Sequence, residues 1–195
     1  MRMATAFIVT FACAAGASAQ GMGAQAQSGD PQLAAFRMQY DIAKKYVTAS
    51  AEKIPEDLYS FQPTPEVRTV ARLLAHIADA NYLFCSASKG EKSPREMGSI
   101  EKSMEKETMT KAALQKELAD SYAYCEAAFS SLQPAQFADK AEFFGMPQTK
   151  LSMLSFSALH GFEHYGNLVT YMRIKNIVPP SSEPQKPAES QGSGM

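Results

Sequence analysis

The chain has 195 residues, which is room for one ordinary domain. Hydrophobic residues make up 45% of it and charged residues 20%, close to the average of a soluble globular protein, and this excludes a wholly disordered chain, a collagen and a coiled-coil rod. The formal net charge is −1, so no basic surface for nucleic acid is indicated and we expect no nucleic-acid partner.

The N-terminal residues 1–19 have the pattern of a secretory signal peptide. Arg2 supplies a positive charge, residues 4–17 are apolar, and the small-x-small sequence that ends at Ala19 predicts cleavage there. The apolar run is too short to span a bilayer and no second one follows, so we expect no membrane span and a secreted or periplasmic location. An N-terminal membrane anchor and lipidation at Cys13 are the alternatives.

Composition divides the rest of the chain into three parts. Residues 20–30 are mostly Gly, Gln, Ala and Ser, which predicts a flexible leader. Residues 179–195 carry four Pro and little to bury, which predicts a disordered tail. Residues 31–178 lie between them without a repeat or a linker, and we expect them to form a single domain.

Apolar residues recur at helical spacing in four stretches, namely residues 33–51, 70–84, 114–132 and 151–172. No stretch alternates convincingly over the length of a strand. Prolines and glycines separate the four stretches, and we expect Thr69 to cap the second helix. The pattern predicts an all-α fold, a four-helix bundle, in which the long polar connection after the second helix crosses over the bundle.

Two cysteines remain once the signal peptide is removed. Cys85 and Cys125 form an even pair in an exported chain, which favours a disulfide in an oxidising compartment. Two separate buried thiols are the alternative, since free Cys packs as a small hydrophobe.

The three histidines of the chain all fall inside expected helices. His160 and His164 are four residues apart, so their side chains share one helical face with Cβ atoms about 5–6 Å apart. That spacing suits two imidazoles on one transition-metal ion. His76 lies in the second helix, and its distance from the pair cannot be derived from the sequence. Ordinary surface or hydrogen-bonded histidines are the alternative interpretation.

Four further polar residues are candidates for the surroundings of such a site. Asp79, one turn after His76, has the spacing of a carboxylate that orients the imidazole, and an exposed helical Asp is the alternative. Asn167 and Tyr171 continue the face of the His pair and are candidate pocket residues, although Tyr171 also suits a packing role. Arg72 either meets an anionic substrate or is an ordinary exposed Arg.

Two segments of the chain resemble the DinB-like superfamily. They are LLAHIADANY at 73–82 and HGFEHYGNLVTYMR at 160–173. Members of that superfamily are four-helix bundles whose second helix offers one His and whose fourth offers an H-x-x-x-H pair, which together hold a divalent metal. The resemblance implies this role for His76, His160 and His164, and it extends from residue 31 to about residue 180. Relatives include thiol-dependent S-transferases, maleylpyruvate isomerase and proteins called metal-dependent hydrolases, and they often pair as homodimers.

The resemblance and the residues together indicate a divalent metal cofactor, with zinc expected first and nickel or iron as alternatives. Three neutral imidazoles leave the ion its charge and an open position, where a bound water can reach a pKa near 7. We therefore expect an exported metal-dependent hydrolase or transferase with a small-molecule substrate. A non-enzymatic metal-binding or interaction protein on the same fold is the alternative. Export and a disulfide argue against thiol transfer, which belongs to the cytoplasm.

Overall fold

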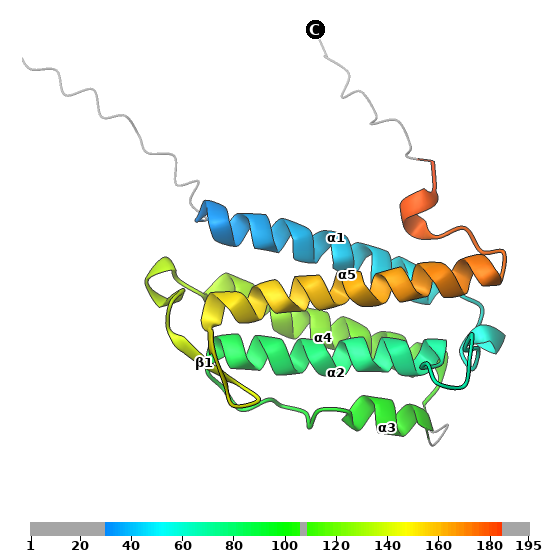
Figure 1. The fold of residues 1–195 in the computed structure, drawn as a ribbon, viewed down its shortest axis with the longest axis horizontal. Helices are drawn as coiled ribbons and strands as arrows, with labels where there is room; N and C mark the ends of the chain where they lie inside the picture. The colour runs from blue at the N-terminus through cyan, green and yellow to red at the C-terminus, as the bar shows by residue number, and fades with distance from the viewer. Residues whose placement is uncertain (1–29, 106–108, 185–195) are drawn as a thin grey trace, which may run out of the picture.

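The computed structural model describes residues 30–105 and 109–184 of the chain. Four long helices, α1 (Pro31–Lys53), α2 (Val70–Lys89), α4 (Lys111–Ser131) and α5 (Lys150–Ile174), lie side by side along the long axis of the molecule (Figure 1). The four-helix bundle expected from the periodicity is confirmed, and each expected helix coincides with an observed one to within one residue at its C-terminal end or lies inside it.

Short polar side chains fix where the long helices begin. The Thr69 side chain accepts a hydrogen bond from the backbone N–H of Arg72, as expected, and Thr110 and Thr149 cap α4 and α5 in the same way. Gly90 ends α2 with φ at 73°, a left-handed conformation that costs a glycine little. Local sequence therefore specifies these helix ends through contacts between residues close in the chain.

The core lies between the apolar faces of the four helices. Helix α2 packs against both α4 and α5, while α1 packs against α5 and α4, so that α4 and α5 lie on a diagonal. Fully buried side chains come from every helix and include Val47, Leu74, Leu118 and Leu154. Burying each such side chain stabilises the fold by about 1.5–3 kcal/mol. Within residues 30–105 and 109–184, no helix combines the length and apolar character that a membrane span requires.

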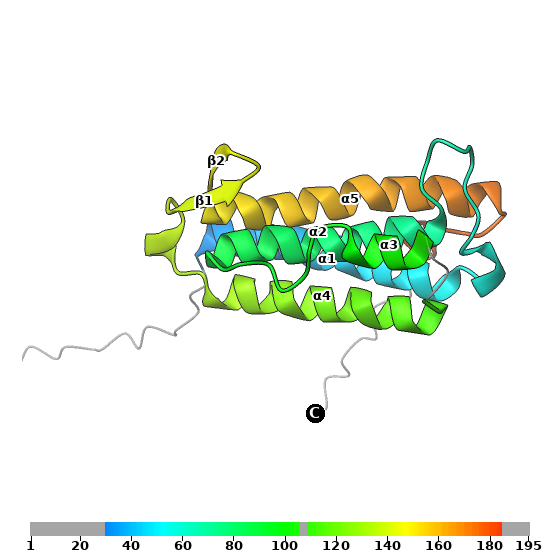
Figure 2. The same cartoon turned by 90° about the horizontal axis from the view of Figure 1, so that it is seen from below.

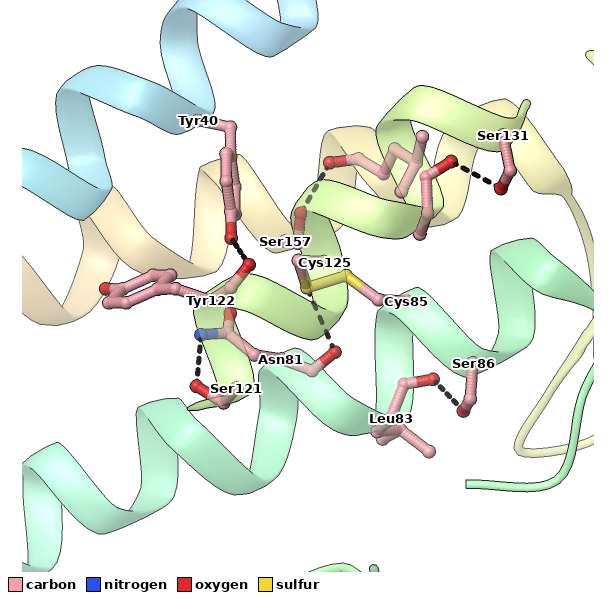
Figure 3. The surroundings of a disulfide bond; sticks show 12 residues. Tyr40, Asn81, Leu83, Cys85, Ser86, Ser121, Tyr122, Cys125, Ser131 and Ser157 are labelled. Atoms are coloured by element: carbon pink, nitrogen blue, oxygen red, sulfur yellow. Dashed lines mark hydrogen bonds between the residues drawn. A yellow bond between two sulfur atoms is a disulfide. The ribbon is translucent and has the colours of Figure 1, made fainter. Parts of the chain in front are cut away.

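Helices α2 and α4 run parallel and in register. The Asn81 amide donates to the Ser121 hydroxyl at 3.1 Å, and one turn further Cys85 and Cys125 form a disulfide (Figure 3). Both pairs are 40 residues apart in sequence, a constant offset that only parallel helices give. The connection between the two helices therefore returns along the length of the bundle, which confirms the expected crossover.

The crossover contains a short helix that the sequence did not predict, α3 (Ser99–Glu105), which lies alongside α2 (Figure 2). The buried Asp79 carboxylate holds its N-terminus, accepting from the backbone N–H of Ile100 at 3.2 Å and of Glu101 at 3.0 Å. Seven residues are too few for a helical period to show in the sequence, and a contact with a distant residue stabilises this helix.

A β-hairpin precedes α5, and the expectation of no strands was wrong. Strands β1 (Lys140–Phe143) and β2 (Met146–Thr149) pair antiparallel, with Lys140 opposite Thr149. The turn residues Phe144 and Gly145 have φ of 48° and 74°, the left-handed values of a two-residue hairpin turn. Strands of four residues are too short for alternation to be recognised.

The chain remains packed on the bundle beyond residue 178, where we placed the start of the disordered tail. The short 3₁₀ helix η3 (Pro180–Ser182) is held by Tyr165, whose hydroxyl donates to the Ser181 hydroxyl at 2.7 Å. Two further 3₁₀ turns, η1 (Glu56–Leu58) and η2 (Pro134–Gln136), lie in connections. The expected signal peptide, nearly all of the leader and residues 185–195 lie outside the described residues.

Candidate metal centre

The three histidines converge on one point between α2 and α5. The Nε2 atom of His160 lies 3.2 Å from Nε2 of His76 and 3.0 Å from Nε2 of His164. One ligand nitrogen from each residue lies within 4.8 Å of the other two. The distance between helices, which the sequence left open, is therefore short enough for a shared ion.

The spacing of the nitrogens fits the ligand shell of a transition-metal ion. Two imidazole nitrogens at tetrahedral positions around zinc, each about 2.0–2.1 Å from it, are about 3.3 Å apart. The observed separations of 3.0 and 3.2 Å are close to that value. His160 Nε2 carries at most one proton, while its two partners both direct a nitrogen at it, and a shared cation satisfies all three lone pairs at once.

The environment keeps the imidazoles neutral. Burial, followed by the positive charge of Arg68, lowers the pKa of His76 to about 4. Burial and the two neighbouring histidines lower the pKa of His160 to about 3, and burial also lowers the pKa of His164. Neutral imidazoles are the form that binds metal, so the fold presents all three as ligands near pH 7.

A carboxylate that the sequence analysis missed faces the ring of His76. Glu101 Oε2, from α3, lies 3.6 Å from His76 Nδ1, an electrostatic contact rather than a hydrogen bond. Its other oxygen, Oε1, accepts from Arg68 Nε at 2.9 Å and from Arg72 Nη2 at 3.1 Å. No local pattern marks Glu101, because only the tertiary packing of α3 brings it to the site.

Asp79 influences the ring of His76 indirectly, and not through the direct contact that we expected. Its two oxygens accept from the backbone of α3, so it bears on His76 through the position of Glu101. Burial raises the pKa of Asp79, and the backbone N–H groups of Glu101 and Ile100 oppose that rise. The expected orienting role is thus divided between Asp79, which places α3, and Glu101, which faces the imidazole.

Asn167 and Tyr171 lie beside the cluster, as the helical spacing indicated. The Asn167 side-chain amide is 3.1 Å from Nδ1 of His164. The amide atom that faces Nδ1 is the nitrogen Nδ2. When His164 binds through Nε2, its proton lies on Nδ1, and Asn167 accepts it once its amide is turned by 180° so that the oxygen takes the place of the nitrogen. The hydroxyl of the buried Tyr171 donates to the backbone carbonyl of Arg68 at 2.9 Å, so this side chain also has a structural role.

A cleft of about 620 Å³ opens beside His164. Asn167 and Tyr171 line it from α5, while Arg68, Arg72 and the loop residues 63–67 line the opposite side. A volume of this size suits a small organic molecule. Arg72, for which two interpretations were open, both lines the cleft and pairs with Glu101.

The opposite side of the cluster is closed by aromatic rings. The ring of Phe84, from α2, meets His160 edge-on with centroids 5.4 Å apart. Phe143 of β1 lies 5.5 Å from Phe84 and 5.8 Å from Phe156 of α5. The hairpin thus adds Phe143 to an apolar wall beside the partly buried His160, a contribution that the sequence analysis missed together with the strands.

The disulfide lies directly behind this wall. Cys85, the neighbour of Phe84, and Cys125 are fully buried, with Cα atoms 5.2 Å apart. The bond joins α2 to α4 on the side of α2 that faces the core (Figure 3). The pairing favoured by the sequence is present in the structure.

A helical bundle with one His on its second long helix and an H-x-x-x-H pair on its last is the arrangement typical of DinB metal sites. The sequence matches the DinB superfamily over residues 39–168, and the chain belongs to that superfamily. No curated protein matches this chain.

Solved structures share the same fold. A DinB-like protein from Bacillus subtilis is 21% identical, with a TM-score of 0.59 over 80% of this chain and 100% of its own. A DinB-like protein from Bacillus cereus is 17% identical, with a TM-score of 0.58, and the match covers 74% of this chain and 93% of that protein. A mycothiol-dependent maleylpyruvate isomerase is 15% identical, with a TM-score of 0.58, but the match covers only 60% of that enzyme and 70% of this chain.

Proposed function

We propose that this chain is an exported metal-dependent enzyme of the hydrolase or transferase class, with His76, His160 and His164 as the ligands of one divalent ion. The observation that carries the proposal is the convergence of three Nε2 atoms, with separations of 3.0 and 3.2 Å, beside a cleft of about 620 Å³. A structural site would be closed by a fourth protein ligand. Among the described residues, the cluster of His, Cys, Asp and Glu side chains contains these three histidines alone.

Each protein group has a definite part in this proposal. The three imidazoles bind through Nε2, and the bound ion supplies a Lewis acid that lowers the pKa of a coordinated water toward 7. Glu101 and the side-chain amide of Asn167 face the outward Nδ1 atoms of His76 and His164, where they would help to orient those rings. The ring of Phe84 packs edge-on against His160 and covers part of it. The cleft beside His164 admits the substrate.

Zinc is the ion we propose. A set of three neutral imidazoles suits zinc, nickel or iron, and availability favours zinc among them. Elemental analysis of protein purified from its native host compartment is expected to find about one equivalent of zinc per chain. One equivalent of nickel or iron would correct the identity of the ion, and the absence of any stoichiometric metal would contradict the site.

Export is the remaining part of the proposal. It is supported by the signal-peptide pattern of residues 1–19 and by the disulfide, which persists in oxidising compartments. Fractionation of the host should recover a chain that begins after Ala19 outside the cytoplasm. A full-length chain in the cytoplasm, with reduced cysteines, would contradict export.

One pair of variants tests the metal-dependent enzyme. His160→Ala removes the central nitrogen and is expected to abolish both stoichiometric metal and turnover in a screen of ester, amide and group-transfer substrates. Glu163→Gln, an exposed position on the same helix, is the matched control and should keep both. Unchanged metal content in His160→Ala would refute the site. Retained metal in the wild type with no turnover across the screen would favour a non-enzymatic metal-binding protein on the same fold.

A further inference from the structure

The guanidinium of Arg68 stands in the cleft beside the histidine cluster with part of its hydrogen-bonding capacity unused. Its Nε donates to Glu101, and its side chain is 39% exposed. Within the described part of the chain, no acceptor pairs with its terminal nitrogens Nη1 and Nη2. A planar fork of two N–H donors in a cleft is the geometry that recognises a carboxylate or a phosphate.

The backbone around Arg68 is held in place from two sides. Its carbonyl accepts the Tyr171 hydroxyl at 2.9 Å, which ties it to α5, the helix of His160 and His164. The next residue, Thr69, caps α2, the helix of His76. The position of Arg68 relative to the three ligands is therefore set by the two helices that carry them. A residue held in this way is preorganised to bind.

The charge balance of the cleft favours an anion. Glu101 is shared between Arg68 and Arg72. Among the described residues, the one carboxylate that lines the cleft is Glu66, which is exposed. The guanidinium groups of Arg68 and Arg72 therefore line the cleft together with a single carboxylate.

Part of the remaining lining of the cleft is apolar. Leu73, the side chains of Pro63, Pro65 and Val67, and the ring of Tyr171 contribute to its surface. A bare inorganic anion would use none of this surface, whereas an organic molecule with one anionic group would bury against it.

We propose that the substrate is a small organic anion, whose carboxylate or phosphate group pairs with Nη1 and Nη2 of Arg68 while the rest of the molecule lies along the cleft toward His164. This inference rests on the proposed function, because it assigns the substrate class of the same site. Arg68 is a binding residue in it and has no part in holding the ion.

Calorimetry with three probes of similar size tests this proposal. Benzoate carries a carboxylate, phenyl phosphate carries a phosphate, and benzamide has neither charge. The zinc-loaded wild type is expected to bind at least one of the two anions at least about tenfold more tightly than benzamide. The tighter of the two identifies the anionic group. Equal affinity for benzamide and for both anions would overturn the proposal.

Variants of Arg68 show whether this residue is responsible. Arg68→Gln should weaken binding of the preferred anion at least about tenfold. Arg68→Lys keeps the charge but loses the planar pair of N–H donors, so its affinity for that anion should lie between those of the wild type and Arg68→Gln. Arg37→Gln is the matched control, because Arg37 is also partly exposed, at 36%, but lies on α1 in an ion pair with Asp41. Anion affinity that is unchanged in Arg68→Gln would overturn the proposal.

The zinc content of each variant separates this inference from the proposed function. Arg68→Gln is expected to keep zinc, since no ligand is changed, so weaker anion binding in it reports on Arg68 alone. If the wild type holds no zinc, the metal-dependent function fails, and the same titrations on the metal-free protein still decide the present proposal. Anion binding that depends on Arg68 would then support it, and its absence would refute it.

Discussion

The carboxylate of Glu101 lies 3.6 Å from the imidazole Nδ1 of His76, although the two residues belong to different helices. The contact exists because Asp79, on the same helix as His76, binds the backbone N–H groups at the start of α3 and so positions Glu101. A carboxylate behind a metal-binding His orients the ring and raises its basicity. Asp79, α3 and Glu101 therefore act as one support for His76.

This support predicts coupled effects of two substitutions. Asp79→Ala and Glu101→Gln should each lower metal affinity by about tenfold or more, because each removes the same orienting contact. The double variant should bind metal about as well as the weaker single variant. Competition with a chromophoric chelator measures these affinities, and Asp120→Asn, an exposed change on α4, is the control. Additive losses would show that the two residues act independently.

The disulfide should contribute to stability rather than to the site. Closing a loop of 40 residues stabilises the fold by about 4 kcal/mol in the loop-entropy account. In a urea titration, the free energy of unfolding of the Cys85→Ala/Cys125→Ala double variant should be lower than that of the wild type by about this amount. The variant should still bind metal, since α2 and α5 hold the ligands. Ser130→Ala, exposed on α4, should change stability little. A loss of metal binding in the folded double variant would contradict this division.

Acid should destabilise the metal-free protein. The pKa of His76 is about 4 and that of His160 about 3 in the folded state, below the ordinary value of 6.5 expected when the chain unfolds. As the pH falls from 7 to 5 the unfolded chain binds protons that the folded one does not, so the free energy of unfolding decreases. We expect a loss of about 1–3 kcal/mol, allowing for partial screening by water.

Urea titrations in the presence of a chelator, at pH 7 and pH 5, measure this loss. The His76→Gln/His160→Gln double variant lacks the two depressed groups and should show a clearly smaller difference between the two pH values. An equal difference in the wild type and in this variant would show that other groups cause the acid sensitivity.

Two glycines of α5 should respond in opposite ways to the same substitution. A Cβ at Gly161 would lie 3.1 Å from the Ala43 Cβ of α1, whereas a Cβ at Gly166 would meet nothing within 4 Å. Gly166→Ala should stabilise the protein by up to about 1 kcal/mol through helix propensity. Gly161→Ala must separate α1 from α5 and should be less stable than Gly166→Ala by about 1 kcal/mol or more. Thermal unfolding of the two variants under the same conditions measures this difference in stability. Equal stability of the two variants would contradict the prediction.

Local patterns in the sequence were enough for the helices and part of the cluster. Apolar periodicity located the four long helices, and Thr69 and Gly90 marked the ends of α2, because these signals depend on neighbours within a few residues. The H-x-x-x-H spacing placed His160 and His164 on one face for the same reason. The resemblance to the DinB-like superfamily then added His76, which spacing alone could not.

The tertiary structure decided the remaining features, because each depends on residues far apart in the chain. Helix α3 is too short to show a period and is stabilised by Asp79, about 20 residues before it. Glu101 and Arg68 reach the site from a crossover and a loop, where no periodic pattern fixes the direction of a side chain. The hairpin that brings Phe143 to the aromatic wall has strands of four residues. The sequence determined which long helices form and which faces they bury, and only the packing of α2, α3 and α5 decided what surrounds the histidines.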